Sequence, residues 1–433
     1  MALGWKLHGD GKRLAPGEVV KPDERLSWPR MIGFGAQHVI AMFGATFVFP
    51  LLMGLDANLA VMMSGVATII FLLVVKGRIP SYVGSSASFV GAVVAIRAAG
   101  GDSGTVTGSL LVVGAVLALV GLVIHLLGIR VIHRVFPPAV TGGVVMLIGF
   151  GMAYVAADVY WPKDPWVALI TMLAGFVFIG VFKGFLGRIG VLLALVFGFV
   201  LSWVWDRVGG MVSVPGGEPH YRVNFDKVAE ADWIGLPSLH GPSFEVSAII
   251  LVLPVVIALI AENVGHVKAV GEMTGADVDG MMGRAVMADG VGTVVATAVG
   301  GPATTTYAEN IGVMAATRVY STAAYYIAAV IAILFGLCPK FGALIAATPD
   351  GVLGGVTTIL YGMIGLLGAK IWSENKVDLA KPATMVPVGA GIICAIGPVA
   401  FPITGTFALS GIALGTIVLL AGYHFLHALD REK

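Results

Sequence analysis

Long apolar stretches separated by short polar links run through almost the whole of this 433-residue chain. Hydrophobic residues make up 58% of it and charged residues only 12%, about half of the charged share of a typical soluble domain. A stretch of about 20 apolar residues is long enough to cross a lipid bilayer as a helix. The pattern predicts an all-α polytopic membrane protein, and it excludes a soluble enzyme, a disulfide scaffold and a disordered chain.

Hydropathy along the chain predicts fourteen transmembrane segments. Their windows are 32–54, 58–76, 83–98, 106–127, 137–157, 165–183, 187–208, 245–268, 285–300, 303–317, 322–338, 350–371, 382–400 and 405–428. With the N-terminus inside, 20 of the 26 Lys and Arg residues fall on the cytosolic side, where such residues collect. We therefore expect a multi-pass protein of the cytoplasmic membrane with both termini in the cytosol. The first 31 residues lack a signal-peptide core and are expected to form a cytosolic tail.

A short repeat relates the two halves of the chain. Pro137–Val144 and Pro349–Val356 both read P-x-x-V-x-G-G-V, and they open the fifth and the twelfth predicted segments. Because seven segments per half is an odd number, the halves would enter the membrane from opposite sides. The sequence thus predicts a 7+7 inverted repeat, which is typical of secondary transporters with a substrate site near the bilayer midplane.

The third segment of each half is short and interrupted. Pro80–Phe89 and Gly300–Asn310 are rich in small and hydroxyl-bearing residues and contain glycine and proline. We expect a short extended (β) segment in each, followed by a half-helix, at the third and tenth segments. The half-helix N-termini would offer free N–H groups and positive dipole ends to a ligand. Simple loops are the alternative.

Ionisable residues inside membrane segments are costly and mark functional sites. Glu262 and His266 lie four residues apart, on one face of a helix, and Glu309 opens the tenth segment. A carboxylate enclosed in an apolar cavity can exchange a proton near neutral pH, and a nearby histidine can share or relay that proton. We interpret these three residues as a proton-coupled binding centre. The alternative is that they only tie helices together.

Four further residues have more than one reading. We favour a structural or supporting role for Asp289, which lies near the cytosolic end of its segment, and an inter-helix hydrogen bond for His38. Tyr307 and Tyr361 lie beside the glycine-rich breaks. Either ring could stack on a planar ligand, and packing in the core is equally open.

Several other functions leave no trace in the sequence. Carboxylate clusters typical of a cation cage, zinc-ligand spacings and phosphate-binding loops are absent. The net charge of +1 gives no basic character suited to nucleic acid. We therefore expect no metal site, no cofactor other than the proton as coupling ion, and no nucleic-acid partner.

The tenth segment carries a family signature. Glu309–Arg318 matches every specified position of [QEP]-N-x-G-x-x-x-x-T-[RKG]. In this motif the chain resembles the nucleobase–ascorbate transporter (nucleobase:cation symporter-2) family, and the surrounding residues resemble its bacterial uracil permease branch. Runs within 37–46, 84–86 and 261–266 share the likeness, which extends from residue 28 to about 428.

The resemblance implies a core domain that moves against a gate domain. The implied units are a cytosolic N-terminal tail (1–31), core helices 1–4 (32–135), gate helices 5–7 (136–208), an external loop (209–244), core helices 8–11 (245–340), gate helices 12–14 (341–428) and a cytosolic C-terminus (429–433). It also implies proton symport across the bilayer by an elevator-type movement, often in a homodimer.

The resemblance also assigns roles to individual residues. Glu262 and Glu309 would hydrogen-bond the base, and His266 would support Glu262 and take part in proton coupling. Main-chain groups of Ala87 and Ala308 would read the base edges. Ala45, Tyr307 and Tyr361 would line the pocket. We expect His38, Ser86 and Asp289 to lie behind this lining.

Two positions depart from the uracil permease pattern. Residue 87 is alanine instead of phenylalanine and residue 308 is alanine instead of glycine, so the pocket must differ in shape. Asp289 followed by Gly290 is similar to purine-transporting members. We expect proton-coupled uptake of uracil or a related pyrimidine, with a purine (xanthine or uric acid) or a broader nucleobase range as the alternative. An anion transporter of this architecture would not favour two buried glutamates, and an enzyme would need a nucleophile or metal that the sequence does not supply.

Overall fold

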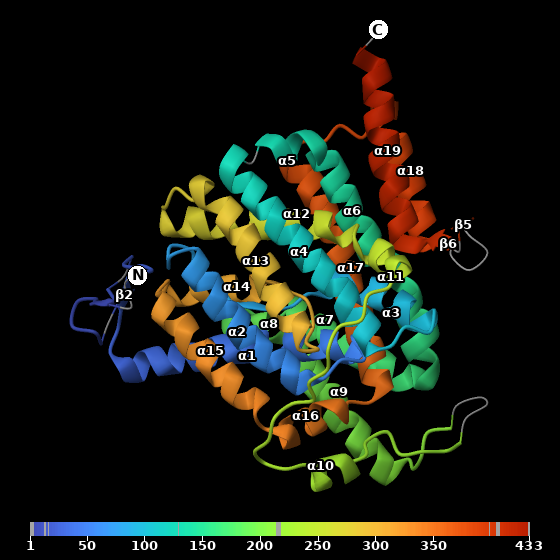
Figure 1. The fold of residues 1–433 in the computed structure, drawn as a ribbon. Helices are drawn as coiled ribbons and strands as arrows, with labels where there is room; N and C mark the ends of the chain where they lie inside the picture. Colours follow the sequence, from blue (N-terminus) through green and yellow to red (C-terminus); the bar gives the residue numbers. More distant parts are fainter. Residues whose placement is uncertain are drawn as a thin grey trace.

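The computed structural model describes residues 4–12, 14–15, 17–128, 130–213, 218–397, 399–403 and 408–431. The first half of the chain contains α1 (Trp28–Met53), α2 (Ala57–Val74), η1 (Ala87–Phe89), α3 (Val90–Ala98), α4 (Ser103–Leu127), α5 (Arg130–Val135), α6 (Pro138–Gly151), η2 (Val155–Tyr160), η3 (Trp161–Lys163), α7 (Pro165–Gly180), α8 (Gly184–Arg188) and α9 (Gly190–Val208) (Figure 1). The second half contains α10 (Asp226–Glu230), α11 (Val246–Val252), α12 (Val255–Thr274), η4 (Asp279–Met281), α13 (Met282–Ala298), α14 (Ala308–Thr317), α15 (Thr322–Gly336), α16 (Pro339–Ala346), α17 (Asp350–Glu374), α18 (Pro382–Ile396) and α19 (Gly411–Arg431).

Short strands pair in three places within the described ranges. They are β1 (Lys6–Leu7) with β2 (Glu24–Arg25), β3 (Val83–Ser85) with β4 (Thr304–Thr306), and β5 (Ala400–Pro402) with β6 (Ala408–Ser410). Of these three strand pairs, β3 with β4 joins the two halves of the chain, whereas the other two each lie within one half.

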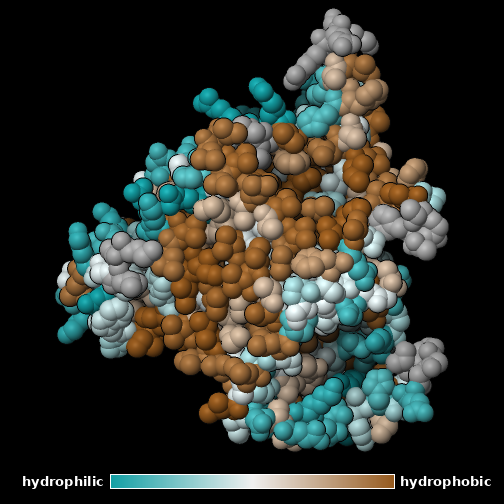
Figure 2. Space-filling model, in the orientation of Figure 1, coloured by the Kyte–Doolittle hydropathy of each residue, from teal (hydrophilic) through white to brown (hydrophobic). Residues whose placement is uncertain are grey.

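The described helices are those of a multi-pass membrane protein. Eight spans are long and apolar enough to cross a bilayer, or nine if α15 and α16 count as one span with an 82° bend. Hydrophobic side chains cover the middle of the face in Figure 2, while hydrophilic ones gather near α10 and near the N-terminal residues. Helices occur at all fourteen predicted windows, but α3, α7, α13, α14 and α18 are shorter than a full span. The count of fourteen crossings therefore stays a prediction.

Polar caps define where helices begin on the side expected to be external. Asp56, Asp102 and Asp164 each accept a hydrogen bond from the backbone N–H three residues further on, at 2.9, 2.7 and 3.1 Å. The hydrogen bonds from Thr105 hold the pKa of the Asp102 carboxyl below its usual range. Such caps satisfy N–H groups that a helix leaves unpaired at its start.

Glycines allow the long helices to lie close together. α4 packs along α13, α2 along α15 and α6 along α17. Along the α6–α17 contact, Gly149 faces the backbone of Gly365, and Gly142 faces Gly368 and the Trp372 ring. Residues without side chains permit this approach between membrane helices.

Residues 5–12, 14–15 and 17–27, expected as part of a polar tail, form a folded N-terminal cap. β1 and β2 pair in parallel, and His8 Nδ1 lies 2.9 Å from Glu24 Oε2. Partial burial raises the pKa of the Glu24 carboxyl. Hydrogen bonds from the Lys21 amide and from His8 outweigh this effect and hold the pKa below its usual range. The cap packs against α1 and α15 through Val20, which is fully buried.

The external loop predicted at 209–244 contains α10, and ion pairs and hydrogen bonds attach it to the helices. Arg222 Nε lies 2.6 Å from Asp164 Oδ2, and its Nη1 lies 3.1 Å from Asp206 Oδ1. These contacts attach the loop to the start of α7 and the end of α9. Further along, Lys340 at the start of α16 donates to the carbonyl of Val228 at 2.8 Å. The loop thus contacts helices that precede it in the sequence, α7 and α9, and one that follows it, α16.

The α6–α17 contact predicts a position-specific cost for a single methyl group. In Gly149→Ala the new Cβ would meet the backbone of Gly365 and lie 2.7 Å from the Tyr361 carbonyl oxygen. We expect overpacking to lower the free energy of unfolding by about 1–3 kcal/mol, measured as a lower midpoint of thermal unfolding in detergent. Gly362→Ala is the matched control, since a Cβ there meets nothing within 4 Å. Equal midpoints for the two variants would refute the close contact.

Candidate functional site

Two strands from opposite halves of the chain meet at the candidate site. β3 and β4 pair antiparallel, with Gly84 opposite Thr305. β3 leads into η1 and α3, and β4 leads into α14. The extended segments expected before both half-helices are therefore present, and the starts of these two helices are brought to one strand pair.

A threonine from a neighbouring helix holds the first residue of each strand. Thr68 Oγ1 on α2 accepts from the Val83 N–H at 2.9 Å and donates to the Val83 carbonyl at 3.2 Å. Thr293 Oγ1 on α13 makes the same two bonds to Thr304, at 3.0 and 3.1 Å. α2 and α13 are the second long helices of their halves, so corresponding helices hold corresponding residues.

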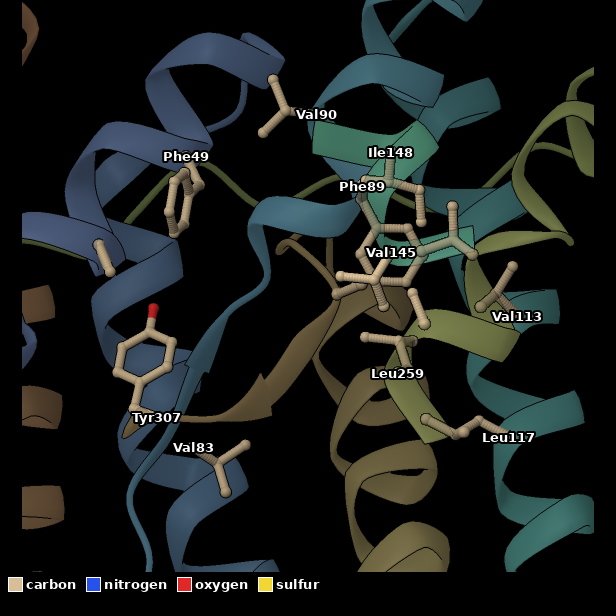
Figure 3. Close-up of a cluster of buried hydrophobic side chains, with 14 of the residues drawn as sticks. Phe49, Val83, Phe89, Val90, Val113, Leu117, Val145, Ile148, Leu259 and Tyr307 are labelled. Atoms are coloured by element: carbon tan, nitrogen blue, oxygen red, sulfur yellow. The ribbon is translucent and has the colours of Figure 1, made fainter. Parts of the chain in front are cut away.

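The Tyr307 side chain is fixed in the packed core beside the strands. Its hydroxyl donates to the Ser85 carbonyl at 2.8 Å and accepts from Thr46 Oγ1 at 3.1 Å. The ring lies over Gly84, where a Cβ would stand 2.7 Å from the ring. Figure 3 shows the hydroxyl directed toward the helix that carries Phe49. The stacking role expected for Tyr307 stays a prediction, since these bonds give the side chain a structural place.

α12 places Glu262 and His266 next to β4. His266 Nδ1 lies 2.8 Å from the hydroxyl of Thr306, the last residue of the strand. Glu262 is half-buried and lies near the carboxyl groups of Asp289 and Glu309. α12, α13 and α14 therefore bring three carboxyl groups and a histidine close to β4.

Asp289 on α13 is paired with an amide from α12. Asn263 Nδ2 donates to Asp289 Oδ2 at 2.7 Å, and both side chains are buried. The Oδ1 atoms of both residues have no hydrogen-bond partner among the described residues. Asp289 is thus bonded to the helix that carries Glu262, and the supporting role expected for it stays a prediction.

The first turn of α14 is tied to α1. Asn310 Nδ2 lies 3.1 Å from His38 Nδ1 and donates to the His38 carbonyl at 3.0 Å. The His38 ring lies against Tyr325 of α15, with centroids 4.3 Å apart. His38 therefore makes an inter-helix hydrogen bond, as its place in an apolar segment suggested.

Four more of the predicted residues lie at the helix starts. Ala87 is half-buried at the start of η1, and Ser86 before it accepts from the Ser88 N–H at 3.3 Å. Ala308 is exposed at the start of α14 and Glu309 is half-buried in its first turn, where the helix dipole favours a carboxylate. Backbone N–H groups and a carboxyl group are thus accessible together at this end of α14.

Ala45 and Tyr361 lie on long helices. Ala45 is buried on α1. Tyr361 on α17 is buried, and its hydroxyl has no partner within the described part of the chain. It lines a cavity of about 320 Å³ together with Phe150, Trp161 and Thr358. The structure places this tyrosine among helices expected in the gate domain.

Sequence reasoning missed the groups that hold the site residues. Thr68 and Thr293 are single hydroxyls in apolar helices, which give no periodic signal. Asn263 was not singled out, although it is the neighbour of Glu262 in the sequence. Thr306 was noted only as part of a hydroxyl-rich run, and its contact with His266 depends on the fold.

Comparison with known proteins places the chain in a family. The model of the Permease family matches residues 30–404. RutG of Escherichia coli (strain K12), which carries the name of a pyrimidine permease, is 42% identical over 423 residues, covering 96% of this chain and 92% of that protein. The chain belongs to this permease family, the nucleobase:cation symporter-2 family.

Two further similarities agree with this membership. The uracil permease of Bacillus subtilis (strain 168) is 33% identical over 413 residues, which cover 90% of this chain and 91% of that protein. The solved transmembrane domain of BicA, a cyanobacterial bicarbonate transporter, superposes with a TM-score of 0.60 at 14% identity. The match covers 94% of this permease and all of that domain, and at this identity it shows the fold alone. The fold is that of a helical membrane transporter.

The threonine bonds to the strands predict a stability effect that depends on position. Thr293→Val leaves the buried Thr304 N–H without its partner, so we expect the free energy of unfolding to fall by about 1–3 kcal/mol. We expect a similar fall for Thr68→Val, which removes the partner of the Val83 N–H. Thr297→Val is the control on the same helix, because its hydroxyl bonds only to carbonyls of α13. Thermal unfolding in detergent measures the three variants. Midpoints that fall equally in all three would contradict the clamping role.

Proposed function

We propose that the protein takes up uracil or a related pyrimidine nucleobase together with a proton. The observation that carries this proposal is the junction of β3 and β4, where two helix starts meet Glu262, His266 and Glu309. The relatives named as pyrimidine and uracil permeases support the class of substrate. Family membership supports transport in place of catalysis.

The chemistry of the junction suits a planar base with alternating donors and acceptors. The carboxyl oxygens of Glu262 and Glu309 accept hydrogen bonds from ring N–H groups. The backbone N–H groups at Ala87 and Ala308 donate to ring carbonyls, helped by the positive ends of both helices. A base whose edges do not match would leave buried polar groups unpaired, and this mismatch would reject it.

The contact between α12 and β4 supports proton coupling. His266 is held at 2.8 Å from the Thr306 hydroxyl, one helical turn from Glu262. We infer that a proton on the Glu262–His266 pair favours substrate binding and the moving state of the protein. The 2.7 Å hydrogen bond between Asn263 and Asp289 joins α12, which carries both residues of this pair, to α13. Chains of ionisable groups inside membrane proteins commonly relay protons.

For the architecture we propose fourteen spans in a 7+7 inverted repeat with both termini in the cytosol. The equivalent bonds of Thr68 and Thr293, and the matching pairs α4–α13 and α2–α15, support a two-fold relation between the halves. The core domain would contain α1–α4 and α11–α15, and the gate domain α6, α7, α9 and α17–α19. The core would carry the base by an elevator-type movement within a homodimer.

Uptake into proteoliposomes tests the function directly. We expect radiolabelled uracil to accumulate faster with an inward proton gradient than without one. Glu262→Gln should weaken uracil binding at least about tenfold, because a charge-assisted hydrogen bond is lost. Glu272→Gln is the control, an exposed glutamate on the same helix, and should bind like the unaltered protein. Normal affinity in Glu262→Gln, with the fold retained, would show that the site is elsewhere.

A competition panel identifies the base. Unlabelled uracil and thymine should displace labelled uracil better than xanthine, uric acid and adenine do, because the relatives named as pyrimidine and uracil permeases indicate a single-ring base. Stronger competition by xanthine or uric acid would change the substrate to a purine while leaving the site in place. No gradient-stimulated uptake of any of these bases would refute nucleobase symport.

A further inference from the structure

The half-helix that carries Glu309 is short. α14 spans ten residues, Ala308–Thr317, and helices of this length are marginal without support from their surroundings. At its start, α14 is held by β4 and by the bonds between Asn310 and His38. The orientation of Glu309 therefore also depends on what holds the other end of the helix.

The counterpart of α14 has an anchor of its own at its far end. In the last turn of α3, the Arg97 guanidinium donates to the Gly54 carbonyl at 3.1 Å and to Ser103 Oγ at 2.8 Å. These bonds join α3 to the end of α1 and the start of α4. At the far end of α14, Arg318 is exposed in the left-handed conformation, with φ 57°. Within the described residues, its side chain makes no hydrogen bond or ion pair that could serve in the same way.

The N-terminal cap holds the far end of α14 instead. The Val20 N–H donates to the Arg318 carbonyl at 3.0 Å, and the Tyr320 N–H donates to the Val20 carbonyl at 2.8 Å. Together they form a parallel bridge between Val20 and Val319. Two residues further on, the N–H and hydroxyl of Thr322 both donate to the Pro22 carbonyl, at 3.1 and 2.9 Å.

Apolar packing reinforces these bonds. Val20, Leu26 and Met31 form a buried cluster with Val319, Ala323 and Ala324. Trp5 donates from its indole N–H to Thr322 Oγ1 at 2.8 Å, and its ring lies edge-on to Tyr326. Figure 1 shows the N-terminal residues beside α1 and α15. The cap is therefore built onto the turn that follows α14, and it joins this turn to α1.

We propose that the N-terminal cap is a positioning element for the substrate site. By fixing residues 318–322 it holds the far end of α14, and through this helix it sets the place of Glu309. The proposal rests on the proposed role of Glu309 as a ligand of the base. Binding groups must be held to within a fraction of an ångström by the shell that supports them, so a loosened α14 weakens the binding of substrate.

Two substitutions at one position test the proposal in the full-length protein in lipid nanodiscs. Val20→Pro removes the N–H that bonds to Arg318, whereas Val20→Ala keeps it and loses only side-chain packing. We expect amide hydrogen exchange in residues 309–321 to become about fivefold faster in Val20→Pro, the effect of one lost hydrogen bond. The change in Val20→Ala should be smaller, and residues 90–98 of α3 should not change in either variant.

Uracil binding to the same samples supplies the second measurement. We expect the dissociation constant to rise several-fold in Val20→Pro, in step with the exchange in α14. Faster exchange confined to the cap, with α14 and uracil affinity unchanged, would overturn the proposal. Unchanged affinity despite faster exchange in α14 would overturn it as well. If the unaltered protein binds no uracil, the proposed function fails, while the exchange in α14 still decides whether the cap holds this helix.

Discussion

The pairing of β3 with β4 is the interaction on which the rest of the structure depends. Backbone groups without partners are very costly in an apolar interior, so a membrane protein can interrupt its helices only where the freed groups are satisfied. Here each strand satisfies the other, and Thr68 and Thr293 bond both polar groups of the first residue in each strand. With the backbone satisfied in this way, two helices can start inside the protein and present their N-termini to a ligand.

The ionisable groups follow from this junction. α12 and α13 pass beside β4, so Glu262, His266 and Asp289 are brought to the strand from the side, and Glu309 arrives at the start of α14. None of these groups is close to the others in the sequence except Glu262 and His266. The same hydrogen bonds that satisfy the backbone thus also gather the carboxyl groups, and we infer that transport and the stability of the junction are linked.

The sequence predicted the strand breaks and the acidic residues, because both stand out against an apolar background. Pro80–Phe89 and Gly300–Asn310 interrupt the hydropathy pattern, and Glu262 with His266 shares one helix face. Thr68 and Thr293 could not be predicted, since a lone threonine in an apolar helix has no special pattern and its role depends on a distant strand. The N-terminal cap was missed for a similar reason. Its polar composition is that of a solvent-exposed tail. The role of its few apolar residues becomes visible only when the fold packs them against Val319 and Ala323.

The most direct test of the account is to locate a bound base. A crystal structure of the protein with 5-bromouracil, with anomalous data at the bromine edge, would place the base without any assumption about its site. The account predicts a bromine peak at the junction of β3 and β4, with the ring between the starts of η1 and α14 and within hydrogen-bond distance of Glu262 and Glu309. A single peak elsewhere, such as in the cavity beside Tyr361 or under the external loop near Arg222, would contradict it.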